Sequence, residues 1–429
     1  MKLTIIGTGY VGLVTGTCFA EVGHQVICVD NNEAKVKMLQ AGGIPIYEPG
    51  LEELVKKNVA AGRLSFSNST AEGVKKSDII FIAVPTPPQP DGSVDLSFIE
   101  RVARDIAGAL TEYKIIVDKS TVPVQTGDKV AETIKRYCKN QAEFDVVSNP
   151  EFLREGFAVE DLMKPDRVVI GVRSQRPVPA MKEVYTPFKA PIIVTDINSA
   201  ELIKHASNSF LALKISYINA VSIICEATGA NVQEVANGMG MDERIGKRFL
   251  NASLGFGGSC FPKDLSAFIK IAEELRYDFG LLKEVQRINA GQMDRFVKKI
   301  VDTLWVLKGK TIGVLGLAFK QNTDDVRTSP AIELCQRLQK EGASLRVHDP
   351  KAMEKAKELL KDVTYVEDMN DVAKGCDALV IATEWDEFKK LDLNRARQEL
   401  SHPIMFDGRN LFDPKEMEKL GFIYKSIGR

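Results

Sequence analysis

Apolar and polar positions alternate along residues 1–195 in a pattern that predicts a sheet covered by helices. Short apolar runs are separated by segments of helical periodicity, which is the βαβ rhythm of a doubly wound fold. The runs that we expect to be strands are 3–6, 26–30, 79–84, 115–118, 145–147, 168–171 and 192–194. Three of them lead into polar or proline-rich segments, at 84–88, 119–123 and 148–156. Because ligands bind beyond the carboxyl ends of such strands, these segments are expected to face the ligands.

Residues 196–297 follow a helical pattern without a convincing strand. From Ala200 to Ile224 the pattern is apolar over most of the helix circumference, which indicates burial on more than one side. Asn198 is expected to cap this helix, with Glu201 as its capping-box partner, and Gly229 is expected to end it. We expect the helix to connect two domains and to pack in part against a second subunit.

Residues 298–429 repeat the pattern of the first region. The apolar runs at 311–316, 345–350 and 377–382 resemble those at 3–7, 26–30 and 78–83. The predicted fold class is therefore α/β, with two Rossmann-like doubly wound domains joined by a long central helix and a helical dimerisation region. The expected domain boundaries are 1–195, 196–297 and 298–429.

The first strand leads into a glycine-rich turn, Gly7-x-Gly9-x-x-Gly12, and the second strand ends at Asp30. Glycines, helix, strand and acid in this register form a dinucleotide-binding fingerprint, although a glycine-rich turn without a cofactor is the alternative. Gly7 makes the tight turn, Gly9 admits a pyrophosphate to the helix N-terminus, and Gly12 lets helix and strand pack closely. Asp30 would bind ribose hydroxyls and repel a 2′-phosphate, which favours NAD over NADP.

A lone cysteine lies in the glycine-rich segment Gly255–Asp264, two residues before Pro262, which is expected to open a helix to about Leu275. A helix N-terminus and the neighbouring Lys263 both favour the thiolate. Taken alone, Cys260 would more often be a buried structural residue. Beside a dinucleotide fingerprint it indicates an oxidation beyond a simple alcohol step, because a thiolate can add to an aldehyde and carry it to a thioester.

Composition narrows the possible classes of function. A chain of 429 residues exceeds one ordinary core, and a formal net charge of −1 argues against binding to nucleic acid or to an anionic membrane. The seven cysteines are scattered without C-x-x-C spacing, which predicts a reducing cytoplasm and no metal site. The sequence has no run of 18 uninterrupted apolar residues, so no transmembrane helix is expected.

Five motifs lie in order along essentially the whole chain: Gly7–Gly12, Asn149–Gly156, Lys204-x-x-x-Asn208, Phe249–Asp264 and Gly316–Lys320. Together they resemble the motifs of the UDP-glucose/GDP-mannose dehydrogenase family. The resemblance implies an NAD domain, a central helical domain that forms a homodimer, and a UDP-binding domain. It also implies a cytoplasmic enzyme that oxidises UDP-glucose to UDP-glucuronate with two NAD and water.

The resemblance further implies catalytic roles. Cys260 resembles the nucleophile that forms the thiohemiacetal and thioester. Lys204 and Asn208, one helical turn apart, resemble the pair that stabilises charge on the C6 oxygen. Asp264 resembles the residue that assists proton removal with Lys204 and a water. Without the other motifs, a lysine and an asparagine at this spacing would ordinarily be interpreted as solvated side chains on a helix surface.

Two further roles and the binding residues follow from the same resemblance. Glu151 resembles the general acid/base of thioester hydrolysis, and Thr121 the residue that orients the catalytic water. Arg244 resembles an arginine offered to the neighbouring subunit's substrate, and His205 is interpreted as structural. The expected NAD contacts are Gly7, Gly9, Val11, Gly12, Asp30, Lys35, Thr86, Thr121, Glu155, Lys263 and Arg327. The expected substrate contacts are Phe152, Leu153, Arg154, Glu155, Lys204, Asn208, Arg244, Phe249, Leu250, Asn251, Ala252, Ser253, Gly257 and Lys320.

Three other hypotheses remain open at this point. The same chemistry could act on GDP-mannose or UDP-N-acetylmannosamine, although Ser259 stands where relatives of the latter type tend to have histidine. A two-electron hydroxyacid dehydrogenase would leave Cys260 without a role. A non-catalytic NAD- or nucleotide-sugar-binding protein would bind without turnover.

Overall fold

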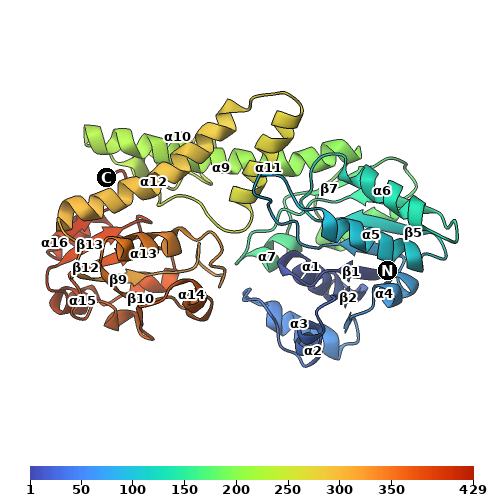
Figure 1. Ribbon diagram of the computed structural model, residues 1–429, viewed down its shortest axis with the longest axis horizontal. Helices are drawn as coiled ribbons and strands as arrows, with labels where there is room; N and C mark the ends of the chain where they lie inside the picture. The colour runs from blue at the N-terminus through green and yellow to red at the C-terminus, as the bar shows by residue number, and fades with distance from the viewer. The chain divides into compact units, whose positions relative to one another are not determined.

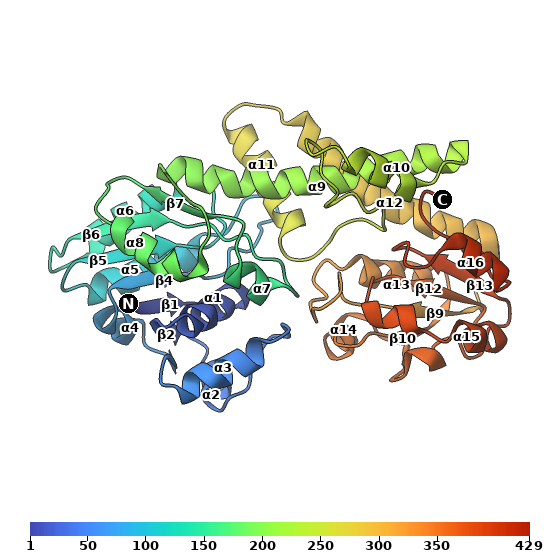
Figure 2. The same ribbon diagram turned by 180° about the vertical axis from the view of Figure 1, so that it is seen from behind.

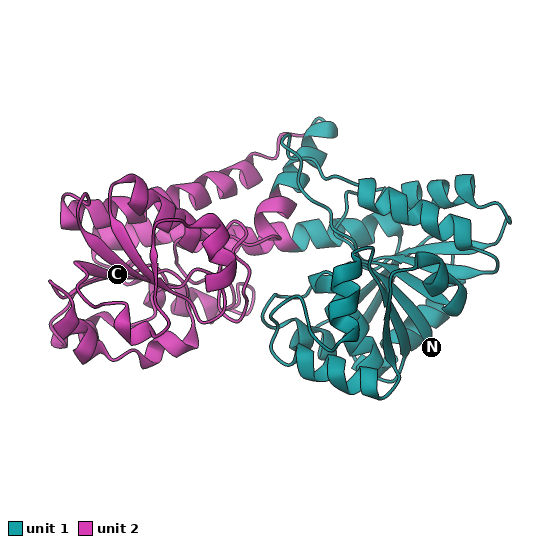
Figure 3. Cartoon of the chain, turned by 60° about the horizontal axis from the view of Figure 1, so that its bottom comes forward, with its two compact units in different colours: residues 1–207, 266–276 teal, residues 208–265, 277–429 magenta.

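The computed structural model describes residues 1–429, and the chain divides into two compact units (Figure 3). Unit 1 comprises residues 1–207 and 266–276, and unit 2 comprises residues 208–265 and 277–429. Two helices, α9 (Ile197–Thr228) and α11 (Phe261–Glu274), contribute residues to both units. Each unit is built around its own sheet.

The sheet of unit 1 has eight strands in the order β3-β2-β1-β4-β5-β6-β7-β8. Neighbouring strands are parallel except for β6 and β7, which are antiparallel. The chain reverses its winding direction between β1 and β4, where α/β sheets bind ligands. The strands are β1 (Lys2–Ile6), β2 (Gln25–Val29), β3 (Leu64–Ser67), β4 (Ile79–Ile82), β5 (Lys114–Asp118), β6 (Phe144–Ser148), β7 (Val168–Val172) and β8 (Ile192–Thr195).

Helices cover both faces of this sheet (Figure 1). Alternate strand residues point to opposite faces, so Ile5 packs in the core under α1 and Ile6 in the core under α5. Burial on both faces explains why the strands read as nearly continuous apolar runs. One face carries α1 (Tyr10–Glu21), α2 (Glu33–Gln40), α3 (Leu51–Ala60), α7 (Ala158–Met163) and α8 (Val178–Tyr185), and the other carries α4 (Thr70–Lys76), α5 (Ser97–Ala109) and α6 (Thr126–Tyr137).

The sheet of unit 2 has six parallel strands in the order β11-β10-β9-β12-β13-β14. This is the order of β1 to β6 in unit 1. Figure 2 labels β9, β10, β12 and β13 of the unit 2 sheet. The strands are β9 (Thr311–Leu315), β10 (Ser344–His348), β11 (Thr364–Tyr365), β12 (Ala378–Ile381), β13 (Ile404–Asp407) and β14 (Ile423–Lys425). The helices are α10 (Val232–Gly240), α12 (Gly280–Leu304), α13 (Pro330–Lys340), α14 (Met353–Leu359), α15 (Leu393–Glu399) and α16 (Pro414–Lys419).

The predicted fold class is confirmed, with two doubly wound sheets and a long central helix. All seven strands expected in residues 1–195 are present, and β3 is the strand that the sequence analysis missed. This strand, Leu-Ser-Phe-Ser, has only four residues, and two of them are polar. Such a short, half-polar strand fits its place at the edge of the sheet. The expected end of the central helix is also confirmed, because α9 ends at Thr228 and Gly229 has a φ of 75°.

The expected cap of the central helix is wrong. α9 begins at Ile197, one residue before Asn198, and Asp196 accepts a 2.8 Å hydrogen bond from the Ser199 N–H. An acid three residues before a free N–H satisfies the first turn better than an asparagine already inside the helix. Glu201, the expected capping-box partner, binds elsewhere, as described below.

By length and composition alone, α9 is apolar enough to cross a membrane, with a mean hydropathy of 1.5 over its most apolar window. Its polar side chains have partners inside the protein instead. Glu201, Lys204 and His205 are all at least 97 % buried, and each binds a group of unit 1. These contacts place the first turns of α9 in the core of unit 1.

Candidate functional site

The turn between β1 and α1 has the geometry of a dinucleotide site. Gly7 has a φ of +101°, and a Cβ there would lie 2.4 Å from the Ala83 carbonyl oxygen. A Cβ on Gly12 would lie 1.9 Å from the Gly7 oxygen, whereas a Cβ on Gly9 would meet nothing within 4 Å. The N-terminus of α1 carries no side-chain cap and no acid in its first turn. Open space before a free helix N-terminus fits a pyrophosphate.

Asp30, just beyond β2, is held as an ionised acid. One carboxylate oxygen accepts hydrogen bonds from the Thr8 N–H (2.9 Å), the Thr8 hydroxyl (2.6 Å) and the Lys35 ammonium (3.0 Å). The other accepts the Asn32 N–H at 3.0 Å. Burial opposes ionisation, but these hydrogen bonds outweigh it and lower the pKa of Asp30. The structure therefore brings Lys35 to Asp30, and the charge that would repel a 2′-phosphate is present.

The loops that follow β4 and β5 are joined at the carboxyl edge of the sheet. Thr86 donates a hydrogen bond from its hydroxyl to the Thr121 carbonyl oxygen at 3.1 Å. Ser120 donates to the Val84 carbonyl oxygen at 2.9 Å. Two expected cofactor-side residues therefore lie together, as the strand-end rule predicts.

The loop after β5 is also fixed to α9 by two buried side chains. The Glu201 carboxylate accepts the N–H groups of Gln125 (2.6 Å) and Gly127 (2.8 Å) at the start of α6. His205, one turn further along α9, binds the Val122 carbonyl oxygen through Nε2 at 2.7 Å. The structural interpretation of His205 agrees with this contact. This contact of Glu201 with the start of α6 was not predicted, because Glu201 was expected to be a capping-box partner instead.

Glu151 and Lys204, two of the expected catalytic residues, form a buried ion pair. Their charged atoms are 3.0 Å apart, and their side chains are 6 % and 4 % exposed. The second Glu151 oxygen accepts the Leu153 N–H at 2.6 Å. The Lys204 ammonium also lies 5.5 Å from the centre of the Phe152 ring. The structure thus gathers Glu151, Phe152, Leu153 and Lys204 in one cluster, in which the two charged residues are buried and Phe152 and Leu153 are half-buried.

The remainder of the loop at 152–157 is held by an acid that the sequence analysis did not find. Glu48 is 3 % exposed, and its carboxylate accepts the N–H groups of Gly156 and Ala158, both at 2.7 Å. Glu155 is buried beside this anchor, whereas Arg154 is exposed and pairs with Asp161. The sequence showed no sign of this contact, because Glu48 binds the backbone N–H of a residue 108 positions later.

Cys260 lies at the N-terminus of α11, as predicted, with the helix beginning at Phe261. Its carbonyl oxygen accepts the Asp264 N–H at 2.8 Å, which places Cys260 at the capping position. Its sulfur lies 3.7 Å from the Ser259 hydroxyl oxygen. Asp264 is 1 % exposed and accepts hydrogen bonds from Asn208 and from the Lys263 ammonium, both at 2.6 Å.

The glycines before Cys260 are required by close packing within unit 2. A Cβ on Gly257 would lie 2.1 Å from the Thr328 carbonyl oxygen. Gly258 has a φ of +82°, and a Cβ there would lie 2.6 Å from the Phe319 ring. The Thr328 hydroxyl donates to the Gly258 carbonyl oxygen at 2.6 Å. The cysteine loop is therefore held against the segment that follows β9.

The expected substrate segment Phe249–Ser253 is anchored by backbone contacts. The Ser253 N–H donates to the Asn219 side chain at 2.8 Å, and its carbonyl oxygen accepts from Gln292 at 3.0 Å. Leu250 and Ala252 are buried, whereas Asn251 is exposed. Asn219 lies on α9 and Gln292 on α12, so side chains of two long helices fix the position of this segment's backbone.

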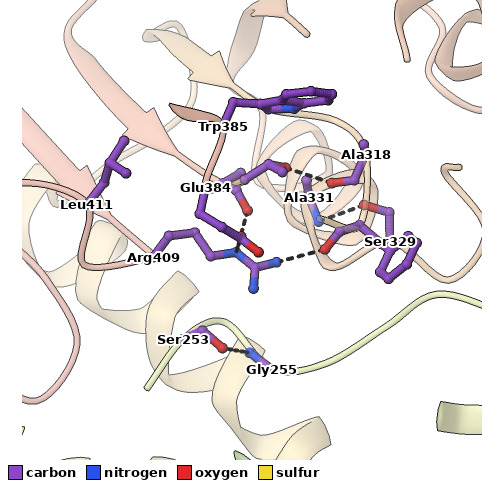
Figure 4. Close-up of polar contacts among 12 residues, drawn as sticks. Ser253, Gly255, Ala318, Ser329, Ala331, Glu384, Trp385, Arg409 and Leu411 are labelled. Carbon is purple, nitrogen blue, oxygen red and sulfur yellow. Dashed lines mark hydrogen bonds and ion pairs between the residues drawn. The ribbon is translucent and has the colours of Figure 1, made fainter. Parts of the chain in front are cut away.

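Arg409, just beyond β13, is a candidate ligand-binding residue that the sequence analysis missed (Figure 4). Its side chain is 8 % exposed and donates to the carbonyl oxygens of Ala382 (2.8 Å) and Phe319 (3.2 Å). It also pairs with Glu384 at 3.1 Å. A buried arginine at the carboxyl edge of a doubly wound sheet suits an anionic ligand. Because β13 was not among the predicted strands, nothing in the sequence indicated that Arg409 lies at the end of a strand.

Three other expected binding residues carry charge at or near the surface. Lys320 has its ammonium 5.4 Å from the Phe319 ring centre. Arg327 pairs with Asp325, and Arg244, with a side chain 89 % exposed, pairs with Asp242. The roles of these residues toward ligands, and that of Arg244 toward a second subunit, stay predictions. No cluster of three or more His, Cys, Asp or Glu side chains suited to a metal ion is present.

Models of known protein domain families match most of this chain. Residues 1–189 match the NAD binding domain of the UDP-glucose/GDP-mannose dehydrogenase family, 198–291 its central domain and 313–414 its UDP binding domain. The chain belongs to this family. Membership confirms an NAD-dependent oxidoreductase, and the UDP binding domain indicates a UDP-sugar substrate.

Individual dehydrogenases of the family are similar over nearly their full length. UDP-glucose 6-dehydrogenase TuaD of Bacillus subtilis (strain 168) is 48 % identical over 429 residues, which cover 100 % of this chain and 93 % of TuaD. The structure of a UDP-glucose dehydrogenase from Pyrobaculum islandicum is 42 % identical with a TM-score of 0.93, covering 99 % of this chain and 96 % of that one. A UDP-D-ManNAc dehydrogenase from Pyrococcus horikoshii is 28 % identical with a TM-score of 0.88, covering 100 % and 99 %.

Proposed function

We propose that this chain oxidises UDP-glucose to UDP-glucuronate, with Cys260 as the nucleophile. The observation that carries the proposal is the position of Cys260 at the N-terminus of α11, followed by a buried Asp264 that binds Asn208. A helix N-terminus favours the thiolate, which is the form that attacks a carbonyl carbon. The relatives named UDP-glucose dehydrogenase are the more similar ones, which supports UDP-glucose over UDP-N-acetylmannosamine and GDP-mannose.

NAD⁺ supplies the chemistry of hydride acceptance, once for each of two oxidations. In the first, Asp264 and Lys204 assist removal of the C6 hydroxyl proton as the alcohol becomes an aldehyde. The Cys260 thiolate then adds to the aldehyde carbon, and the resulting thiohemiacetal oxygen is stabilised by Lys204 and Asn208. Loss of the second hydride from the same carbon leaves a thioester on Cys260.

The last step releases the acid. Glu151 takes a proton from a water that Thr121 orients, the hydroxide attacks the thioester carbon, and the C–S bond breaks to return the Cys260 thiolate. The ion pair with Lys204 and the Leu153 N–H keep the Glu151 carboxylate in a fixed orientation. A fixed carboxylate is what proton transfer to a defined oxygen requires.

Cofactor and substrate have separate binding residues in this proposal. NAD contacts are the open turn at Gly9, the ionised Asp30 with Lys35, the loop residues Thr86 and Thr121, and in addition Val11, Glu155, Lys263 and Arg327. The UDP-sugar contacts are residues 152–155, Phe249–Ser253, Gly257, Lys320 and Arg409. The proposed functional regions are 1–195, 196–297 and 298–429.

We also propose a cytoplasmic location. All seven cysteines are free, which is typical of proteins in a reducing compartment.

We further propose that the protein is a homodimer through α9. Phe210, Tyr217 and Ile224 are spaced seven residues apart and are 60 %, 52 % and 63 % exposed. A stripe at heptad spacing is the pattern of a helix that packs on another helix. Arg244 would then act at the partner's substrate. A Tyr217→Glu variant should sediment as a monomer, and an unchanged dimer would contradict this interface.

The test of the enzymatic proposal is the number of NADH formed per UDP-glucose consumed, for the wild type and for Cys260→Ser. Two NADH per UDP-glucose, with loss or stalling in the variant, is the expected result. One NADH with an unaffected variant would leave a simple two-electron dehydrogenase. Faster turnover of GDP-mannose or UDP-N-acetylmannosamine would reassign the substrate, and binding without turnover would indicate a sensor.

A further inference from the structure

Lys119, the first residue after β5, is a buried lysine to which the reaction above gives no role. It is 3 % exposed, and its ammonium donates to the Asn149 side-chain oxygen at 3.2 Å and to the Tyr185 hydroxyl at 3.4 Å. Both acceptors are neutral. A buried ammonium without a direct ion pair is costly, so an interior that keeps one calls for a further explanation.

The partner Asn149 connects Lys119 to the expected catalytic loop. Its side-chain oxygen accepts hydrogen bonds from Lys119 and from Tyr185, and its side-chain amide donates to the Val169 carbonyl oxygen at 2.8 Å. Its N–H donates to the Asp118 carbonyl oxygen at 2.8 Å. Asn149 is thus fixed on every side, and only Pro150 separates it from Glu151.

The charge of Lys119 also acts on the Glu151–Lys204 pair. Burial lowers the pKa of Lys119 to about 8, attraction to Glu151 opposes that effect, and repulsion from Lys204 adds to it. Such couplings are mutual, so the Lys119 charge attracts the Glu151 carboxylate and repels the Lys204 ammonium. The charged and titratable groups around Lys119 are therefore Glu151 after β6, Lys204 on α9 and Tyr185 on α8, and Tyr185 stays neutral because burial raises its pKa.

We propose that Lys119 is a positioning residue that orients Glu151 through Asn149 and places a positive charge beside the Glu151–Lys204 ion pair. This inference rests on the proposed function, because it assigns Lys119 to the two proton transfers of that reaction. Unprotonated Lys204 can share in proton removal from the C6 hydroxyl, and ionised Glu151 can accept a proton from water. The ammonium of Lys119 acts on the charges of both groups.

The chain offers a matched control at the other end of the same strand. Lys114 begins β5, is also 3 % exposed, and pairs with Glu112 at 2.6 Å. It lies at the amino end of the strand, opposite the edge at which doubly wound sheets bind ligands. Lys114→Met and Lys119→Met each remove one buried ammonium from β5 or its end, but only the second removes it beside Glu151.

The experiment measures kcat and KM for UDP-glucose from pH 6 to 10, together with the thermal midpoint, for wild type, Lys119→Met, Lys119→Arg and Lys114→Met. For Lys119→Met we expect kcat to fall roughly tenfold or more with little change in KM, since general acid–base steps are affected. The acid limb of the kcat profile should move to higher pH by roughly half a unit or more, because removing a cation raises the pKa of its neighbours. Lys119→Arg should restore the position of the limb, and Lys114→Met should keep the wild-type profile.

The thermal midpoint separates positioning from folding. Replacing an ammonium that lacks a direct ion pair with an apolar side chain should leave the midpoint of Lys119→Met unchanged or raise it. A lower midpoint with an unshifted pH profile would show that Lys119 is structural and would overturn the inference. A wild-type profile in Lys119→Met would overturn it as well. If the wild type itself forms no NADH from UDP-glucose, the proposed function fails first and the role of Lys119 falls with it.

Discussion

The two sheets share their strand order but differ at the turn that follows the first strand. Gly7 and Gly316 have similar φ values, +101° and +103°, and each packs just beyond the fourth strand of its unit, on Ala83 and Thr383 respectively. An acid follows the second strand in both units, Asp30 in unit 1 and Asp349 in unit 2. From Gly7 the chain enters α1 at Tyr10, whereas α13 begins only at Pro330. The same fold therefore presents a helix N-terminus directly after the turn in one unit but not in the other.

The two acids show what this difference means for ligand binding. Asp349 is fully buried, and its carboxylate accepts the N–H groups of Leu317 and Ala318 and the indole N–H of Trp385 at 2.7, 3.0 and 3.1 Å. Its other oxygen accepts two further N–H groups after β10. Asp30 is 9 % exposed and lies beside the open space at Gly9. One acid holds the turn closed, and the other is available to a ribose.

The largest expected effect is on the closed turn. Asp349→Ala should lower the free energy of unfolding of unit 2 by about 3 kcal/mol or more, because four buried donors lose their acceptor. Urea unfolding followed by the fluorescence of the buried Trp385 measures this loss. Asp349→Asn, which keeps one oxygen, should lose less. An unchanged denaturation midpoint in the alanine variant would show that the carboxylate does not stabilise the turn.

The next effect separates two glycines of the open turn. Gly12→Ala should cost about 2 kcal/mol of stability, because its Cβ would overlap the Gly7 carbonyl oxygen. Gly9→Ala should change stability by less than about 0.5 kcal/mol, since the Cβ meets no protein atom. It should still weaken NAD binding, measured by titration calorimetry, because the methyl group occupies the space before α1. Equal losses of stability in the two variants would contradict this assignment.

Much of the open turn could be predicted from the sequence, because its signals are local. Gly7, Gly12 and Asp30 follow from strand, turn and helix in register, and Cys260 follows from its place just before a proline in the first turn of a helix. The anchors Glu48 and Arg409 could not be predicted. Glu48 binds backbone 108 residues later and Arg409 binds the Phe319 carbonyl oxygen 90 residues earlier. Such pairings arise only when the sheet brings distant loops to one edge.

A smaller effect concerns the choice of cofactor. Asp30→Asn removes the charge but retains an acceptor for the Thr8 N–H, so the fold should persist. The preference for NAD over NADP should fall by about tenfold, which corresponds to about 1.4 kcal/mol. The ratio of kcat/KM for the two cofactors measures this change, with Lys35→Met as the comparison. A preference that stays at the wild-type ratio would mean that another group excludes the 2′-phosphate.

The smallest effect compares two acids at matching positions, Asp118 at the end of β5 and Asp407 at the end of β13. Burial raises the pKa of both. Asp407 has partners for both oxygens, including the Tyr424 hydroxyl at 2.6 Å, whereas one oxygen of Asp118 has no hydrogen-bond partner. An acid whose pKa is raised on folding retains its proton, so its contribution to stability is lost as pH rises above the unfolded value.

Asp118→Asn should therefore remove a decline in the stability of unit 1 above about pH 4, the ordinary pKa of an aspartate. At pH 8 its free energy of unfolding should be unchanged or higher by about 1 kcal/mol, because the uncharged amide replaces an acid that burial keeps from ionising. Asp407→Asn should be less stable than the wild type at every pH, since Tyr424 and the backbone donors lose a carboxylate acceptor. Urea unfolding at pH 5 and pH 8 tests both variants. A stabilised Asp407→Asn would show that the hydrogen bonds around that acid do not outweigh its burial, and the two strand ends would then be equivalent.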